Sequence, residues 1–66
     1  MREDAAALAA AIRAACVAAA VAAYEDAGIQ GLCAEGRWEV AVNAMETLDL
    51  APVIRSLADA PDAAED

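Results

Sequence analysis

The alanine-rich stretch from Ala5 to Ala23 limits the possible folds of this chain more than any other part of the sequence. Alanine has the highest helix propensity, so the stretch predicts one long helix beginning near residue 5. Glu3 and Asp4 precede it, where their charges suit the positive end of the helix dipole and Asp4 can cap free backbone N–H groups. A buried alanine methyl contributes little, on the order of 0.8 kcal/mol per carbon. This helix should therefore form easily but bury little.

The larger side chains of this helix fall on two faces. At 100° per residue the two sets lie about a third of a turn or more apart. They are Leu8, Ile12 and Cys16 on one face, and Val17, Val21 and Tyr24 on the other. A helix with two apolar faces can contact its own hairpin partner and a second chain together.

Arg13 interrupts the apolar surface of the helix. One interpretation is that its side chain reaches water along the neighbouring alanine methyls. The other is that it pairs with an acidic residue of another chain and fixes the register of two helices.

The sequence leaves two positions open for the end of the first helix. Gly28 can end it as a C′ glycine, with Ile29 giving the apolar contact of a Schellman motif. Alternatively the helix runs to about Ala34 and stops at Gly36, at a cost of about 1 kcal/mol for each interior glycine. The longer helix keeps an apolar stripe in phase, and this continuity favours it. The stripe is Val17, Val21, Tyr24, Gly28 and Leu32.

A second helix is predicted from about Arg37 to Leu48 or Asp49. Its apolar residues follow the i, i+3, i+4, i+7, i+10 spacing of one helical face. They are Trp38, Ala41, Val42, Met45 and Leu48. Trp38 is the only tryptophan, so this stripe holds the largest apolar side chain, and we expect it to pack on the first helix.

A short third helix is predicted next. Asp49 suits its N-cap, and Pro52 suits its first turn, where no backbone N–H is needed. Its apolar face is Leu50, Ile54, Leu57 and Ala58. Pro61 should end it, and the acidic residues 61–66 are predicted to be disordered, which leaves residues 1–60 as a single helical domain.

Five residues between positions 28 and 52 follow the spacing of a known helical repeat. Gly36 stands at a turn, Trp38 at an aromatic position, Ala41 at a small position, Met45 at a large apolar position and Pro52 at a terminator. In this pattern the segment resembles the second half of a tetratricopeptide repeat, although the proline comes one residue early and there is a single copy. The resemblance implies an antiparallel helical hairpin. A peptide-binding groove in that family needs about three stacked units.

The formal net charge is −8, with twelve acidic residues, four arginines and no lysine or histidine. Nucleic-acid binding requires a basic face that displaces counterions, so direct binding is not expected. The negative charge also argues against binding to an anionic membrane surface. The charge can serve solubility, or it can let the chain occupy the nucleic-acid site of a basic protein.

The two cysteines, Cys16 and Cys33, indicate reduced thiols in the cytoplasm. On one helix they would be about 25 Å apart, too far for a disulfide within the chain. A disulfide between two chains stays open. With no histidine, a zinc site within one chain is not expected.

The stretch from Ala5 to Ala23 is also long enough for a membrane span. Arg13 lies in its middle and alanine has little affinity for hydrocarbon, so we expect no membrane insertion. Glu3 and Asp4 after Arg2 remove the positive start of a signal peptide. These features predict a cytoplasmic protein.

The sequence contains no catalytic or cofactor motif. Glu35, Glu39 and Glu46 lack an accompanying histidine or serine nucleophile and are interpreted as solvated, so we expect no enzyme and no cofactor. Arg37 could bind an anion or stack on Trp38, but solvation of the turn is the simpler interpretation.

The sequence therefore predicts an all-α protein: a long alanine-rich helix, an antiparallel amphipathic helix and a short third helix. Chains this short are marginal without disulfides, metal or association, so we expect a homodimer, most simply a four-helix bundle. The expected function is a small acidic protein-interaction module, with itself and another protein as partners. The alternative is an acidic, antitoxin-like inhibitor of a basic nucleic-acid-binding protein. The predicted interaction residues are Leu8, Ile12, Arg13, Val17, Val21, Tyr24, Trp38 and Met45.

Overall fold

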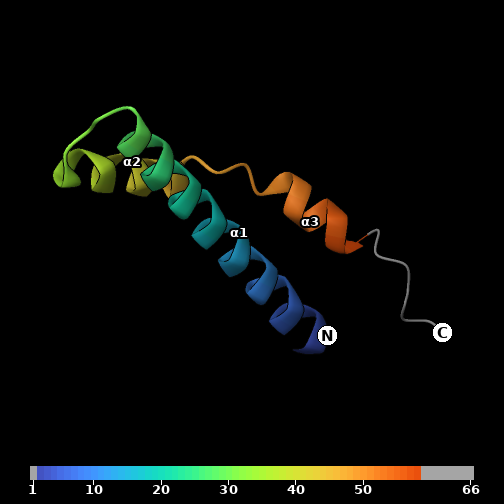
Figure 1. Ribbon diagram of the computed structural model, residues 1–66. Helices are drawn as coiled ribbons and strands as arrows, with labels where there is room; N and C mark the ends of the chain where they lie inside the picture. Colours follow the sequence, from blue (N-terminus) through green and yellow to red (C-terminus); the bar gives the residue numbers. More distant parts are fainter. Residues whose placement is uncertain (1, 59–66) are drawn as a thin grey trace.

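The computed structural model describes residues 2–58, with side chains from Asp4 to Leu57. The described part consists of three α-helices: α1 (Arg2–Ile29), α2 (Ala34–Glu46) and α3 (Ala51–Ala58). The all-α prediction is thereby confirmed. In Figure 1, α2 folds back beside the end of α1, and α3 continues toward the other end of the long helix. The predicted tail at 61–66 lies outside the described residues.

A Schellman motif ends α1. Gly31 is its C′ residue and has a φ of +92°, a left-handed conformation that glycine adopts without strain. The Leu32 N–H donates to the Ala27 carbonyl at 3.0 Å, and the Gly31 N–H donates to the Gly28 carbonyl at 3.0 Å. Both predicted endings of the helix are therefore wrong. Gly28 stays inside the last turns of α1, and the chain leaves the helix after Ile29 instead of continuing toward Gly36.

The second helix begins earlier than predicted. Cys33 is its N-cap, with extended backbone angles and no side-chain capping bond. Gly36 therefore lies in the first turn of α2 and not at the turn between the helices, where the tetratricopeptide resemblance had placed it. Leu32 packs against it, because a Cβ atom at position 36 would meet the Leu32 side chain at 3.4 Å.

The second helix also ends earlier, at Glu46. Both the N–H and the hydroxyl of Thr47 donate to the Asn43 carbonyl, at 3.0 Å and 2.8 Å. A threonine hydroxyl that bonds a carbonyl four residues back slightly destabilises a helix, and α2 ends with Thr47 as its C-cap, before the predicted Leu48. Pro52 does not terminate α2, since it comes six residues later, within the first turn of α3.

The N-cap of α3 lies one residue later than the predicted Asp49, because the helix begins at Ala51, but Asp49 still supports the first turn. Its carboxylate accepts a hydrogen bond from the Ala51 N–H at 3.1 Å, two residues on, which satisfies one free donor of the first turn. The strict N-cap is Leu50, whose carbonyl accepts from the Ile54 N–H at 3.0 Å. Pro52 has no N–H to lose at this position.

The core of the described chain is very small. Ala27 and Ala41 are its only buried residues, 3% and 4% exposed, and they belong to the hairpin of α1 and α2. Ala41, which the tetratricopeptide resemblance gave as a small residue, is thus one of the two buried residues of the hairpin. Trp38 is 62% exposed, so the expectation that it would anchor the hairpin core is wrong. With α1 longer than its partners, the chain has a radius of gyration of 15.1 Å, against about 11 Å for a compact domain of this length.

Candidate interaction surface

Arg37 fastens the two hairpin helices together. Its Nε–H donates to the Leu32 carbonyl at 2.9 Å, and its guanidinium carbon lies 5.8 Å from the centre of the Tyr24 ring. The same group lies beside Gly28, where an added Cβ atom would be 3.1 Å from Cζ and Nη1. Neither an anion site nor stacking on Trp38 is needed to account for this arginine. Its geometry is that of a structural clamp between α2, α1 and the turn.

Next to this clamp is an exposed apolar surface, which we call the open face: Val17, Val21, Tyr24 and Trp38. Val17 and Val21 are 54% and 49% exposed, and Tyr24 is also exposed. A shallow groove of about 270 Å³ crosses this surface where α2 lies on α1, and its lining includes Val21, Tyr24 and Trp38. The structure thus brings four of the predicted interaction residues together on one side of the hairpin.

Arg13 belongs to the open side of α1. It is exposed, and at 100° per residue it lies within 40° of Val17 and 20° of Tyr24. The arginine therefore borders the second apolar face instead of standing midway between the two. Its long stem can lie along the alanine methyls of α1 while its charge stays in water.

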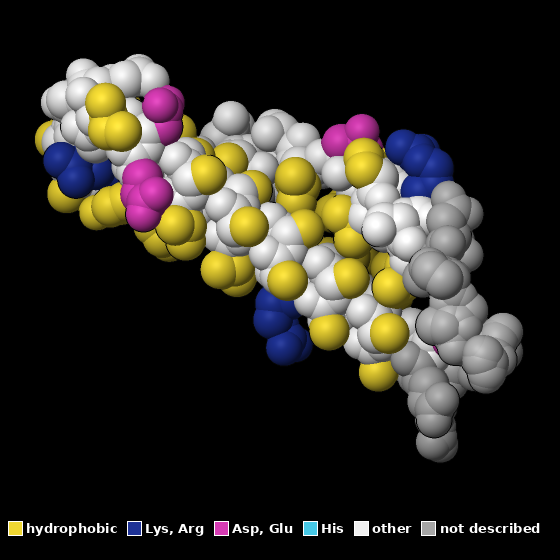
Figure 2. All heavy atoms as spheres, turned by 45° about the vertical axis from the view of Figure 1, so that its right-hand side comes forward, with side chains coloured by type: hydrophobic (Ala, Val, Ile, Leu, Met, Phe, Trp, Pro, Cys, Tyr) yellow, Lys and Arg dark blue, Asp and Glu magenta, His cyan; other side chains and the backbone are white. Residues whose placement is uncertain are grey.

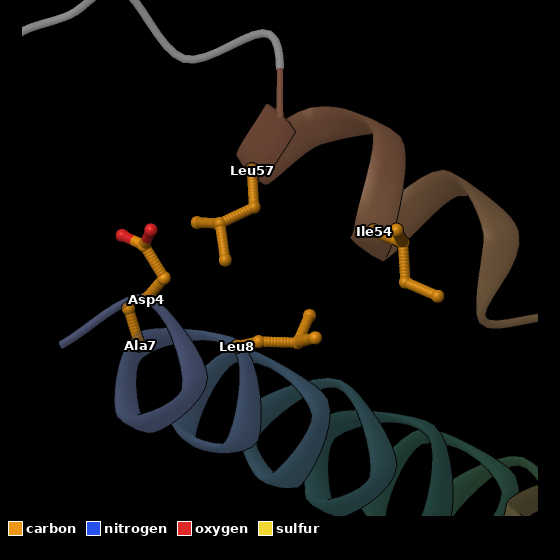
Figure 3. A pocket seen from close by; sticks show the side chains of 5 residues that line it. All are labelled: Asp4, Ala7, Leu8, Ile54 and Leu57. Atoms are coloured by element: carbon orange, nitrogen blue, oxygen red, sulfur yellow. The ribbon is translucent and has the colours of Figure 1, made fainter. Parts of the chain in front are cut away.

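The remaining predicted interaction residues do not belong to the open face. Leu8, Ile12 and Met45 are half-buried, and so is Cys16, which shares the face of Leu8 and Ile12 on α1. Figure 3 shows Leu8 below α3, facing Ile54 and Leu57 across an open groove. This groove measures about 500 Å³, and Asp4 and Ala7 complete its lining. The first apolar face of α1 is therefore occupied within the chain, loosely at its N-terminal end.

Apolar side chains extend along the long helix in the space-filling view (Figure 2), with only scattered charged groups between them. Large apolar side chains are exposed on all three helices. They are Val17, Val21, Tyr24, Ile29, Trp38, Val40, Ile54 and Leu57. Single exposed apolar residues such as Ile29 are ordinary on a protein surface, so only the residues grouped in the open face form a patch.

The region from Asp4 to Ile29 is long and apolar enough to cross a membrane by length and composition alone, with a mean hydropathy of 2.0 in its most apolar window. None of that window is buried within the described chain. The predicted absence from membranes and the predicted cytoplasmic location therefore stay predictions.

Cys16 and Cys33 are both free thiols, half-buried and exposed respectively. From Cys16 to the end of α1 at Ile29 the helix rises about 20 Å. The two cysteines do not share one helix, as the sequence argument assumed, because Cys33 is the N-cap of α2, but this rise still separates Cys16 from the end of α1 near which Cys33 follows. Within residues 2–58 no group of three or more possible metal-binding side chains comes together.

No protein-family model matches the chain, and no curated protein or solved structure matches it significantly. The tetratricopeptide resemblance thus stays one of residue spacing, with the turn and the terminator displaced as described above.

Proposed function

We propose that the chain is a protein-interaction module, an adaptor or regulatory subunit and not an enzyme, that acts through the open face and pairs first with a second copy of itself. The observation that supports this is the imbalance between core and surface. Ala27 and Ala41 are buried, whereas Val17, Val21 and Trp38 are about half exposed or more. Burying a large apolar side chain contributes roughly 1.5–3 kcal/mol, so association offers far more than the internal core does.

A dimer of two such hairpins would make a four-helix bundle around α1 and α2. In helix bundles short loops join antiparallel neighbours, and the four residues 30–33 fit that description. The alanine-rich surface of α1 suits close helix packing, because small side chains let two backbones approach.

The test is the molar mass by light scattering behind size exclusion, over a hundredfold concentration range with reductant present. We expect twice the chain mass of 6.7 kDa at the upper concentrations. A fully helical species that keeps the mass of one chain at every concentration, and captures no other protein, would refute the proposal.

We further propose that α1 works in water, in the cytoplasm. Arg13 lies near the middle of the apolar stretch, and an arginine at the centre of a membrane-spanning helix costs about 2.5–3.5 kcal/mol on insertion scales. Glu25 and Asp26 add charge at the far end of the helix. Partition between buffer and neutral vesicles tests this, and we expect the protein to remain in the buffer.

The second candidate function, an acidic inhibitor of a basic nucleic-acid-binding protein, is supported by one arrangement. Glu35, Glu39 and Glu46 are exposed and lie within 40° of one another around α2, at 100° per residue. Titration with an arginine-rich peptide at low and high salt is the test, since exposed charge pairs are screened by salt. An affinity that does not change with salt concentration, or that is the same after replacement of all three glutamates by glutamine, would refute this candidate function.

A further inference from the structure

We propose that the groove on the open face holds a lysine side chain from a basic segment of a partner protein. This inference rests on the proposed function, because it names the kind of partner that the same face takes besides a second copy. A second copy cannot supply this side chain, since the chain contains no lysine. Three observations support the assignment: the size of the groove, the two aromatic rings that line it, and the charge beside it.

The groove has a size that suits one side chain. Its volume is about 270 Å³, below the roughly 300–1,000 Å³ of pockets that enclose small molecules. Ala20, Val21 and Ala41 form its aliphatic lining. Lysine carries its charge on a flexible four-carbon stem, and such a stem can lie on apolar groups while the ammonium stays at the water.

Both aromatic residues of the chain line this groove, each from a different helix. Tyr24 belongs to α1 and Trp38 to α2. Tyr24 already has a cation over its ring, the Arg37 guanidinium at 5.8 Å. Among the described residues no cation lies over Trp38, although tryptophan is the side chain that attracts cations most strongly. Since Trp38 is 62% exposed, its ring can take a cation from outside the chain.

The charge beside the groove favours a cation over an anion. Glu25 is the charged residue among the described residues of the lining, and it is exposed. Arg37 is not part of the lining, and its Nε–H is bonded to the Leu32 carbonyl, so its position is fixed by the turn. The net charge of −8 attracts a basic segment over a longer range at low salt.

The rest of the open face indicates the form of the basic segment. Val17, Val21 and Tyr24 extend along α1 over about 10 Å at 1.5 Å per residue. A partner helix with anchoring side chains at i, i+4 and i+7 covers the same length, as in helix-in-groove recognition. We therefore expect an amphipathic helix whose apolar stripe contains a lysine at the level of the groove.

Binding of matched peptides tests the assignment. The probe is a dye-labelled, alanine-based helical peptide of about 15 residues, with leucine at i and i+7 and lysine at i+4. Two matched peptides carry norleucine or trimethyl-lysine in place of the lysine. Fluorescence anisotropy is measured at low salt, at the lowest chain concentration of the light-scattering series.

We expect the lysine peptide to bind about 10-fold more tightly than the norleucine peptide. The rings should supply about 2- to 5-fold of this preference, and the exposed carboxylate a similar factor. The trimethyl-lysine peptide should bind at least as tightly as the lysine peptide, because a contact between a cation and a ring needs no N–H donor.

Two variants and one control assign the preference to the groove. Trp38→Leu removes the ring but keeps an apolar side chain, and Glu25→Gln removes the charge at nearly constant size. Each should reduce the preference for lysine to about 3-fold, and the double variant should abolish it. Asp26→Asn is the matched control, because it removes the same charge one residue away, outside the lining, and its side-chain oxygen can still accept from Gln30. It should keep the 10-fold preference.

Each result has a separate meaning. Equal binding of the lysine and norleucine peptides would overturn the inference, as would a preference that Asp26→Asn lowers as much as Glu25→Gln does. A dimer mass without binding of any peptide would also overturn it, but would leave the proposed function standing. Binding of the lysine peptide by a chain that keeps a mass of 6.7 kDa at every concentration would support the inference and refute self-pairing. Self-association that is lost in both Arg13→Ala and Trp38→Leu, with no preference for lysine, would assign the groove to Arg13 of a second copy and overturn the inference.

Discussion

The guanidinium of Arg37 occupies the space beside Gly28 that a side chain at position 28 would need. A Cβ atom there would lie 3.1 Å from Cζ and Nη1 of the arginine, closer than ordinary van der Waals contact. Because the arginine also bonds the Leu32 carbonyl and lies on Tyr24, this one contact links the end of α1, the turn and the start of α2. Glycine at position 28 thus leaves room for this contact, despite its low helix propensity.

Gly28→Ala should destabilise the hairpin by about 1 kcal/mol, although alanine is the better helix former. The gain of about 1 kcal/mol in propensity is outweighed by loss of the arginine bond, about 1.5 kcal/mol for a charged donor, and of the ring contact. In an Arg37→Ala background the same substitution should instead stabilise the fold by about 1 kcal/mol. Urea unfolding of the four proteins measures this coupling. Equal effects in both backgrounds would show that the two residues do not interact.

Gly31→Ala should cost about 1–2 kcal/mol, because its φ of +92° lies in the left-handed region that other residues adopt only with strain. Gly36→Ala is the matched control. It lies in the first turn of α2, and its new methyl would meet Leu32 at an ordinary distance of 3.4 Å. We expect the control to be neutral or stabilising by up to about 1 kcal/mol. The midpoints of urea unfolding measure the stability of the two variants. A Gly31→Ala protein as stable as the parent would contradict the Schellman assignment.

Asp49→Ala should reduce the population of α3 at a cost of about 1 kcal/mol, since the Ala51 N–H loses its acceptor. Asp49→Asn keeps a side-chain oxygen at that position and should retain most of the helix. Carbon chemical shifts of residues 51–57 report the helix content directly. If the two variants behave alike, the carboxylate contributes through its charge and not through this hydrogen bond.

Val17→Asp should weaken self-association by about 100-fold or more. The substitution acts twice in a symmetric dimer, and each copy loses a buried apolar side chain and gains a charge that must be desolvated. Ile29→Asp, at a position 84% exposed and away from the open face, should leave the dimer mass unchanged. Sedimentation or light scattering over a concentration series compares the two. Equal loss of association in both would show that the interface lies elsewhere on α1.

The emission of Trp38 should move to shorter wavelength as the protein concentration rises. Its ring is 62% exposed in the single chain and borders the groove on the open face, so a docked copy would take it out of water. Because Trp38 is the only tryptophan, the shift reports this position alone. The Val17→Asp protein is the control and should keep the long-wavelength emission. A spectrum independent of concentration in a dimeric parent would remove Trp38 from the interface.

The three helices were predictable because local interactions decide most of them. Alanine propensity is sufficient for α1, and Asp49 and Pro52 mark the start of α3 by their own backbone chemistry. The predicted boundaries of α1 and α2 were wrong for a related reason. Gly28, Gly31 and Gly36 can each end a helix, and only the left-handed angle at Gly31 and the carbonyl bonds at Ala27 and Gly28 select one of them.

The sequence by itself determined that the chain is helical, acidic and poor in core-forming side chains, because propensity, charge and side-chain size belong to single residues. It also determined the two apolar faces of α1, because a helix has a fixed rotation per residue. The tertiary structure decided which face remains free. Packing of α2 on Ala27, and the clamp of Arg37 on Tyr24, leave Val17, Val21 and Trp38 in water. That outcome depends on where the turn falls and how two helices cross, and no periodicity within a single helix contains this information.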